Sequence, residues 1–288
     1  MKNLIIAAAF AAAFTLAPQA KAQCPAGLVD PLYLLDGSNW AFQTEDDFFG
    51  EGAVGTFRAS VKAPAGNNPF FSGVLAITET INAEGRITRQ LQASGKYIIN
   101  SDCSGGELLF NAGGHAYQFE FVFAKGRTKM FLVTDNTSPR AVGLSQFVGD
   151  HGTAVLTPLG CPAGVVDPLT RLAGAWSFHA EDIVTGSVGI FNASIVNGLG
   201  FLNVTETTTV LGEVIRGQVF TGKFQVYPDC SGGELLFNTG RNSLQYEFVF
   251  ADGGNEIFMV SDTAIPFRFG QPLRVGGLAG NRGAAERF

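Results

Sequence analysis

Charged residues are scarce in this sequence, and the balance between them is acidic. Lys, Arg, Asp and Glu make up 15% of the 288 residues, with 25 acidic and 19 basic side chains and a formal net charge of −6. No stretch of the chain gathers the basic residues into a stripe. Because nucleic acids and anionic membrane surfaces bind proteins through clustered positive charge, we expect neither to be a partner.

The signatures of common catalytic and cofactor sites are also missing. The sequence has no Gly-x-Ser-x-Gly motif and no glycine-rich phosphate loop that opens a helix. It has only three histidines. His115 and His179 do not recur in the internal repeat described below, and His151 falls in the predicted linker. We therefore expect no shared histidine triad, no zinc site and no cofactor.

Long apolar runs are missing except at the amino terminus. An apolar stretch from Leu4 to Leu16 leads to Ala20-Lys21-Ala22, which matches the A-x-A cleavage pattern. We predict a signal peptide over residues 1–22 and secretion to the periplasm or the extracellular space. Gln23 stands before Cys24, where a lipoprotein generally has a small residue, so we favour a soluble secreted protein. No later segment approaches the ~18–20 apolar residues that a membrane span needs.

The rest of the chain is an internal duplication. Cys24–Leu32 returns as Cys161–Leu169 with one change, and Asp102–Asn111 returns unchanged as Asp229–Asn238. Repeats of solenoid proteins run roughly 20–50 residues, so a period this long indicates a duplicated domain. We predict two domains, at residues 23–157 and 158–288.

Each copy contains one early and one late cysteine. Four cysteines permit three pairings, which the sequence by itself leaves open. The repeat favours Cys24–Cys103 and Cys161–Cys230, because bridges between copies would require two independent domains to dock in one particular way. Such bridges fit a chain that leaves the reducing cytosol.

The spacing of short apolar runs predicts an all-β fold. Alternating segments such as Gln118–Phe123 are separated by Gly, Pro and Asn about every 8–12 residues. We count eight in the first copy: Trp40–Glu45, Gly52–Val61, Gly73–Ile81, Arg86–Ser94, Lys96–Asn100, Glu107–Asn111 with Ala116–Phe123, Lys129–Thr134 and Ala141–Val148. We predict two tandem antiparallel barrels of about eight strands each, with β-sandwiches as the alternative.

A short motif in the second copy carries a family resemblance. Gly174-Ala175-Trp176 resembles the Gly-x-Trp element of lipocalins and related calycins, whereas the first copy has an extra residue before Trp40. The whole repeat also resembles uncharacterised secreted bacterial domains with lipocalin-like or allene-oxide-cyclase-like barrels. The resemblance implies a barrel with an apolar cavity and an arginine, such as Arg140 or Arg268, stacked near the tryptophan. We expect Trp40 and Trp176 to be core or barrel-floor residues rather than platforms for a ligand, although the two roles overlap in calycin-like folds.

One pair of charged residues recurs in both copies. Glu79 and Arg89 of the first copy match Glu206 and Arg216 of the second. By alternation Glu79 shares a face with apolar neighbours, and Arg89 lies close to the position facing it across a hairpin. If this face points into the barrel, the pair would bind a ligand's polar group. We favour the ordinary alternative, a half-exposed cross-strand ion pair that contributes little.

Three functions compete on this basis. We favour a secreted, non-enzymatic protein whose barrels bind a small hydrophobic or amphipathic ligand. The first alternative is a structural or interaction protein of the cell envelope or extracellular space with solidly filled barrels. The second is a cofactor-free isomerase or cyclase that uses the Glu–Arg pairs.

Overall fold

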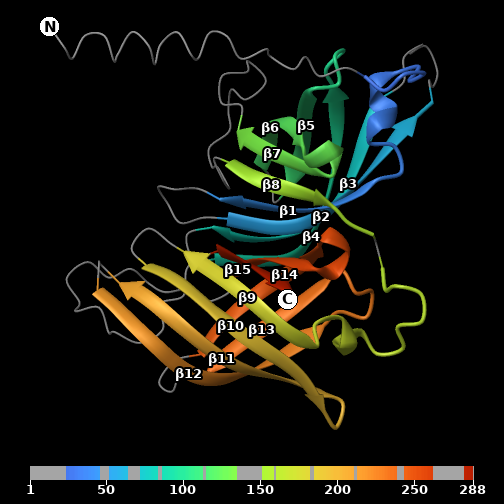
Figure 1. Ribbon diagram of the computed structural model, residues 1–288. Coiled ribbons are helices and arrows are strands. Elements are labelled where there is room, and N and C mark those ends of the chain that lie inside the picture. The colour runs from blue at the N-terminus through green and yellow to red at the C-terminus, as the bar shows by residue number, and fades with distance from the viewer. Residues whose placement is uncertain are drawn as a thin grey trace, which may run out of the picture.

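The described residues form two closed antiparallel barrels of eight strands each, which confirms the predicted fold class (Figure 1). The computed structural model describes residues 24–45, 52–63, 72–83, 86–112, 115–134, 151–158, 160–181, 185–210, 213–238, 243–261 and 282–287. The predicted signal peptide lies outside these ranges, as do Arg140 and Arg268. Within the described ranges, none of the helices could span a bilayer.

The first barrel runs in simple up-and-down order, each strand pairing with the next. Its strands are β1 (Asn39–Glu45), β2 (Gly52–Lys62), β3 (Ser72–Ala83), β4 (Arg86–Ile99), β5 (Gly105–Ala112), β6 (His115–Ala124), β7 (Lys129–Thr134) and β8 (His151–Leu156). The ring closes where β8 pairs with β1. In this up-and-down order a short turn is enough to join each strand to the next, and closure of the ring leaves no unpaired strand edge among the described strands.

The strand count was predicted correctly, but the predicted division of β4 to β6 was wrong, and so was the placing of His151 in a linker. Arg86–Ile99 is one unbroken strand, because Gly95 does not turn the chain; a Cβ at this position would clash with the carbonyl oxygen of Leu109 on β5. The runs Glu107–Asn111 and Ala116–Phe123, which were counted together as one strand, are two strands, β5 and β6. Ala141–Val148 lies outside the described residues, and the eighth strand begins at His151, which the sequence placed in the linker.

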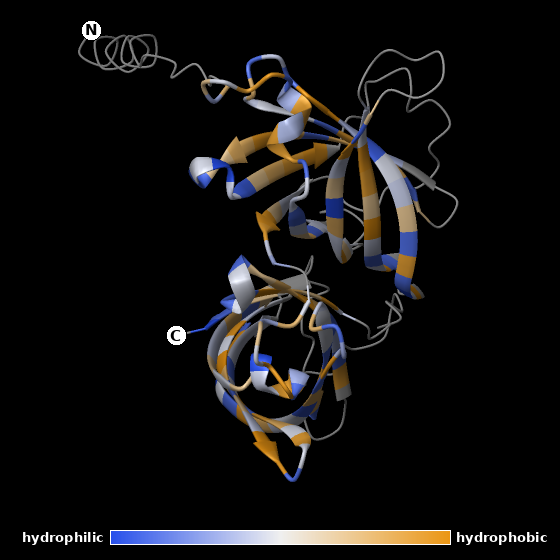
Figure 2. Ribbon diagram, turned by 90° about the vertical axis from the view of Figure 1, so that its right-hand side faces the viewer, coloured by the Kyte–Doolittle hydropathy of each residue, from blue (hydrophilic) through white to orange (hydrophobic). Residues whose placement is uncertain are grey.

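The second barrel repeats this order. Its strands are β9 (Gly174–Glu181), β10 (Thr185–Val196), β11 (Leu199–Val210), β12 (Glu213–Val226), β13 (Gly232–Asn238), β14 (Ser243–Ala251), β15 (Glu256–Ser261) and β16 (Arg282–Arg287), with β16 closing on β9. Figure 2, which looks nearly along the axis of this barrel, shows the closed ring. A tight loop at Asn197-Gly198 joins β10 to β11 with φ of 52° and 74°, as a type I′ hairpin turn requires.

Both predicted disulfides are present, Cys24–Cys103 and Cys161–Cys230. Each ties the segment before a barrel to the turn between its fourth and fifth strands. Asp102 Oδ1 accepts hydrogen bonds from the backbone amide and hydroxyl of Ser104, and Asp229 does the same with Ser231. These side-chain bonds stabilise the two turns.

A short 3-10 helix closes one end of each barrel. In the first barrel this is η1 (Pro31–Leu34), where Asp30 caps the helix by accepting a hydrogen bond from the Leu32 amide. Leu32 packs against the barrel core, and its carbonyl oxygen accepts a bond from the Tyr97 hydroxyl at 2.9 Å. The equivalent helix of the second barrel, η4 (Pro168–Arg171), is capped in the same way by Asp167.

The barrels pack on each other through their outer faces, which we call the inter-barrel contact. Its apolar part combines Ala41, Val54 and Val155 of the first barrel with Val249, Ala251, Phe258 and Val260 of the second. In Figure 1, β1 and β2 accordingly lie against β14 and β15. Among the hydrogen bonds that cross it are those from Asn82 Nδ2 to the Ser261 carbonyl at 2.9 Å and from Thr157 Oγ1 to the Phe250 carbonyl at 3.4 Å.

Candidate functional site

Glu79 lies in the interior of the first barrel. Leu75, Ile77 and Ile81 alternate with outward-facing positions along β3, and all three belong to the barrel core. Glu79 falls in the same phase and is 3% exposed. The prediction that Glu79 shares a face with Leu75 and Ile77 is therefore confirmed, and that face is the apolar interior.

The environment of Glu79 is unusual for a carboxyl group. Its Oε1 is buried and has no hydrogen-bond partner among the described residues. Burial raises the pKa of Glu79 from 4.5 to about 7, because a low-dielectric interior disfavours the charged form. Near neutral pH this carboxyl therefore exists in both protonation states.

Glu206, the equivalent residue of the second barrel, is also buried but is hydrogen-bonded. Ser187 Oγ donates to its Oε2 at 3.1 Å, and Thr208 Oγ1 donates to its Oε1 at 3.0 Å. Burial raises the pKa of Glu206, and the two hydroxyl bonds act in the opposite direction. In the first barrel Ala53 and Ile81 stand at the positions of these two hydroxyl residues.

The structure does not place Arg89 with Glu79. A β-bulge interrupts the β3–β4 ladder after the Glu79–Leu91 pair, and Gln90 adopts a left-handed φ of 51°. The extra residue shifts the alternation of β4, so Arg89 faces outward instead of sharing the interior face with Leu91. Arg216 is likewise exposed beside a bulge, where Gly217 has φ of 64°.

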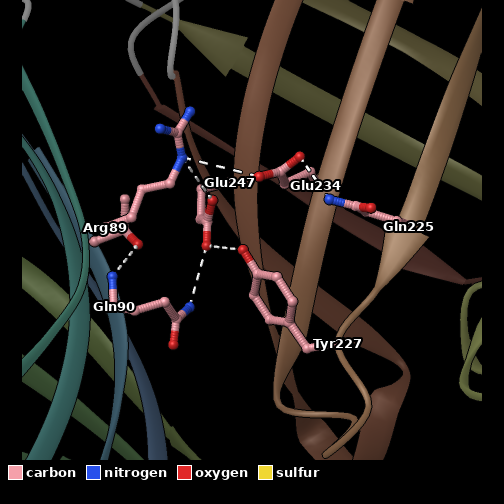
Figure 3. A network of polar contacts seen from close by, with 7 residues as sticks. Arg89, Gln90, Gln225, Tyr227, Glu234 and Glu247 are labelled. Carbon is pink, nitrogen blue, oxygen red and sulfur yellow. Dashed lines mark hydrogen bonds and ion pairs between the residues drawn. The ribbon is translucent and has the colours of Figure 1, made fainter.

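Arg89 instead joins a polar network across the inter-barrel contact (Figure 3). Its Nε lies 3.5 Å from an oxygen of Glu247 and 3.9 Å from an oxygen of Glu234, both in the second barrel. Gln90 Nε2 donates to Glu247 Oε1 at 3.2 Å, and the Tyr227 hydroxyl also donates to this oxygen. Burial, and to a smaller extent the charge of Glu234, raises the pKa of Glu247, and the bonds from Tyr227 and Gln90 and the charge of Arg89 offset only part of this rise.

Sequence analysis missed the role of Glu247. Alternation along β14 places Glu247 on the outer face of its barrel, but the outer face at this point is covered by the other barrel, and the residue is buried. The crevice beside it, lined by Thr56, Thr80 and Tyr227 among others, holds no more than about one water molecule. The network therefore holds the two barrels together and does not form a ligand pocket.

Trp40 and Trp176 are fully buried in the two cores. Trp40 stacks on Phe57 with ring centroids 6.1 Å apart, and Trp176 stacks on Phe191 at 6.0 Å. The arginine over Trp176 is Arg287 of β16, whose guanidinium lies 4.9 Å from the ring centroid. Both tryptophans thus contribute to core packing.

The described residues contain no group of three or more His, Cys, Asp or Glu side chains arranged to hold a metal ion. No family model matches the chain, and no curated protein matches it. One solved structure with some similarity is the crystal structure of a protein of unknown function from the DUF3598 family of Nostoc punctiforme. It has 12% sequence identity, covers 90% of this chain and 98% of that chain, and has a TM-score of 0.20. A likeness of this degree carries no argument about function.

Proposed function

We propose that this protein is an exported, non-enzymatic binding module whose first barrel holds one small amphipathic molecule through Glu79. The observation that supports this is the buried Oε1 of Glu79, which has no hydrogen-bond partner in the described part of the chain. Buried polar atoms of folded proteins are nearly always hydrogen-bonded, so an exception in an apolar interior calls for a partner. Ligand pockets combine apolar walls with a few such polar groups.

The chemistry of the site defines the class of ligand. The group facing Glu79 should be a hydrogen-bond donor, such as a hydroxyl or an amine, and the rest of the molecule should be apolar. Glu79 lies six residues along β3 from Gly73, which pairs with Tyr97 next to the closing helix η1. At ~3.3 Å per residue this is about 20 Å from the closed end, so the ligand would lie toward the opposite end.

The second barrel should not bind the same molecule. Glu206 already accepts hydrogen bonds from two hydroxyl groups of its own barrel. The donor that a ligand would supply in the first barrel is therefore supplied by the protein in the second. We expect one ligand per chain rather than two.

Native mass spectrometry of the exported protein, purified from its own host, tests this proposal. We expect a mass excess of one small molecule that disappears on denaturation. Glu79→Gln should lower the occupancy at least tenfold, a loss of about 1.4 kcal/mol. The matched control Glu206→Gln should leave it unchanged. A bare polypeptide mass at every protein concentration, or equal losses in both variants, would contradict the proposal.

Export and domain organisation are part of the same proposal. Residues 1–22 have the pattern of a signal peptide, and two disulfides indicate an oxidising compartment outside the cytoplasm. We take residues 23–157 and 158–288 as the two domains. The isomerase or cyclase alternative loses its proposed apparatus, because Arg89 faces the other barrel and not Glu79.

A structural or interaction role is the second candidate, and exposed apolar side chains favour it. Val122 on β6 and Phe131 and Val133 on β7 are each about half exposed on the outer face of the first barrel. Contiguous exposed apolar residues on a folded surface commonly mark an interaction site.

A further inference from the structure

The apolar surface that the second barrel buries in the inter-barrel contact recurs uncovered on the first barrel. Val249, Phe258 and Val260 on β14 and β15 are 9%, 3% and 1% exposed. Their repeat equivalents on β6 and β7 are Val122, Phe131 and Val133, which are 55%, 51% and 52% exposed. The same three side-chain types thus form a covered face in one copy and an open face in the other, which we call the receiving face.

The surface that does the covering also recurs. Val54 of the first barrel is buried in the inter-barrel contact and pairs across the ladder with Thr80. Its equivalent in the second barrel is Val188, which pairs with Thr207 and is 58% exposed. Ile190, two residues further along β10, is 44% exposed. We call this open surface of β10 and β11 the covering face of the second barrel.

The charges of the inter-barrel contact are retained on both open faces. Within the chain, Arg89 pairs with Glu247 and Glu234. The equivalent arginine, Arg216, is exposed next to the covering face of the second barrel, and Glu120 and Glu107 take the equivalent positions beside the receiving face. An arginine on one open face therefore meets two carboxylates on the other if the packing of the two barrels is repeated.

The shapes also compensate. In the inter-barrel contact Tyr227 and Thr56 line the same crevice from opposite barrels. On the receiving face Asn100 replaces the tyrosine, and it lines a groove of about 240 Å³ together with Val122, Phe131 and Val133. On the covering face of the second barrel Ile190 replaces the threonine. The side chain is smaller on one side and larger on the other, as close packing requires.

We propose that the receiving face of the first barrel binds the covering face of the second barrel of another copy of this chain, repeating the inter-barrel contact between molecules. Such a contact is heterologous, so an assembly of any length keeps one receiving face at one end and one covering face at the other, where further copies can add. At the far edge Ser177 and Glu286 replace Ala41 and Val155. The apolar part is therefore smaller than within the chain, and the association is correspondingly weaker.

Sedimentation velocity of the exported protein between about 1 and about 500 µM, a range that brackets weak association, measures this directly. We expect the average mass to rise past that of a dimer with concentration. Val133→Asp on the receiving face and Val188→Asp on the covering face are matched substitutions of exposed strand valines. Each alone should weaken association more than tenfold.

Mixing the two variants identifies the geometry. Val133→Asp keeps an intact covering face and Val188→Asp an intact receiving face, so an equimolar mixture should form a dimer that grows no further. Recovery on mixing also shows that both variants are folded. Combining Glu120→Arg with Arg216→Glu in one chain should restore the association that either substitution weakens.

Three results would overturn the proposal. The first is a wild-type protein that stays monomeric throughout, as it would if another segment of the same chain covered the receiving face. The second is association sensitive to only one of the two valines, which indicates a symmetric contact. The third is an inactive mixture. Glu79→Gln should leave assembly unchanged, so assembly and ligand binding are tested separately.

Discussion

Glu79 and Glu206 occupy the same position in two copies of one domain, yet their surroundings differ by two hydroxyl groups. Ser187 and Thr208 donate hydrogen bonds to Glu206, whereas Ala53 and Ile81 stand at the corresponding places near Glu79. The second barrel thus satisfies its buried carboxyl internally, and the first leaves one oxygen without a partner among the described residues. This difference is the basis of the proposal that the first barrel binds a ligand and the second does not.

The comparison of Glu79 with Glu206 requires that the two barrels be otherwise similar. Removing each disulfide in turn tests this similarity, and we expect it to change the free energy of unfolding more than any other substitution below. The bridges span 79 and 69 residues. On the chain-entropy model, loops of this length each contribute about 4 kcal/mol. We expect Cys24→Ser with Cys103→Ser and Cys161→Ser with Cys230→Ser to lower the free energy of unfolding by similar amounts in urea titrations. A large difference between them would show that the barrels depend on their bridges unequally.

Removing the charge of Glu79 should have the next largest effect. The folded-state pKa of about 7 lies above the ordinary 4.5, so the folded protein binds this proton more tightly than the unfolded chain. The free energy of unfolding should therefore decrease by about 3 kcal/mol as the pH rises from about 4.5 to about 7. In Glu79→Gln this loss should vanish, making the variant more stable than wild type at pH 8 but not at pH 4. Urea titrations at both pH values measure it, and an unchanged pH profile would contradict the assignment.

Exchanging the hydroxyl groups sharpens the comparison itself. Ala53→Ser with Ile81→Thr should lower the pKa of Glu79, because hydrogen bonds to a charged group contribute roughly 1.5–3 kcal/mol each. Ser187→Ala with Thr208→Val should raise the pKa of Glu206 further. Carboxyl ¹³C NMR titration reports both. If the first pair leaves the pKa of Glu79 in place, the missing donors are not its cause.

The smallest expected effect concerns the two bulges. Gln90 and Gly217 occupy equivalent left-handed positions, and a side chain there costs about 1 kcal/mol. Gly217→Gln should lower the free energy of unfolding by about that amount. Gln90→Gly should gain less, because it also removes the hydrogen bond to Glu247. Thermal unfolding of the two variants separates these outcomes, and equal and opposite shifts would mean that the bond contributes nothing.

Most of the fold could be predicted from the sequence because its signals are local. Alternation along each strand, turn residues between strands and the repeated cysteines identified two eight-stranded barrels with their bridges. The interior position of Glu79 followed from the same alternation. The boundaries failed where a residue type had two meanings, as at Gly95, which permits close strand approach rather than a turn.

The candidate site could be predicted only in part. The bulge at Gln90 reverses the side on which Arg89 projects. The sequence could not predict this bulge, because Gln seldom adopts a left-handed conformation. Glu120 and Glu247 show the second limit. Their surrounding strands, Gln118–Phe123 and Gln245–Phe250, are nearly identical, yet one glutamate is exposed and the other buried. Whether the glutamate is buried depends on whether the other barrel packs against its strand. The residues next to it in the sequence carry no information about this packing.

The identical segments Asp102–Asn111 and Asp229–Asn238 pose a problem of folding fidelity. Each supplies the fifth strand of its own barrel, and either could in principle be inserted into the other ring while the chain folds. Misassembly between similar domains is a characteristic failure of repeat proteins. Cys103 and Cys230 lie inside these segments, so each disulfide records which barrel received which copy. Because the two strand segments are identical, only the pairing of the cysteines distinguishes a correctly assembled barrel from one that holds the other copy's strand.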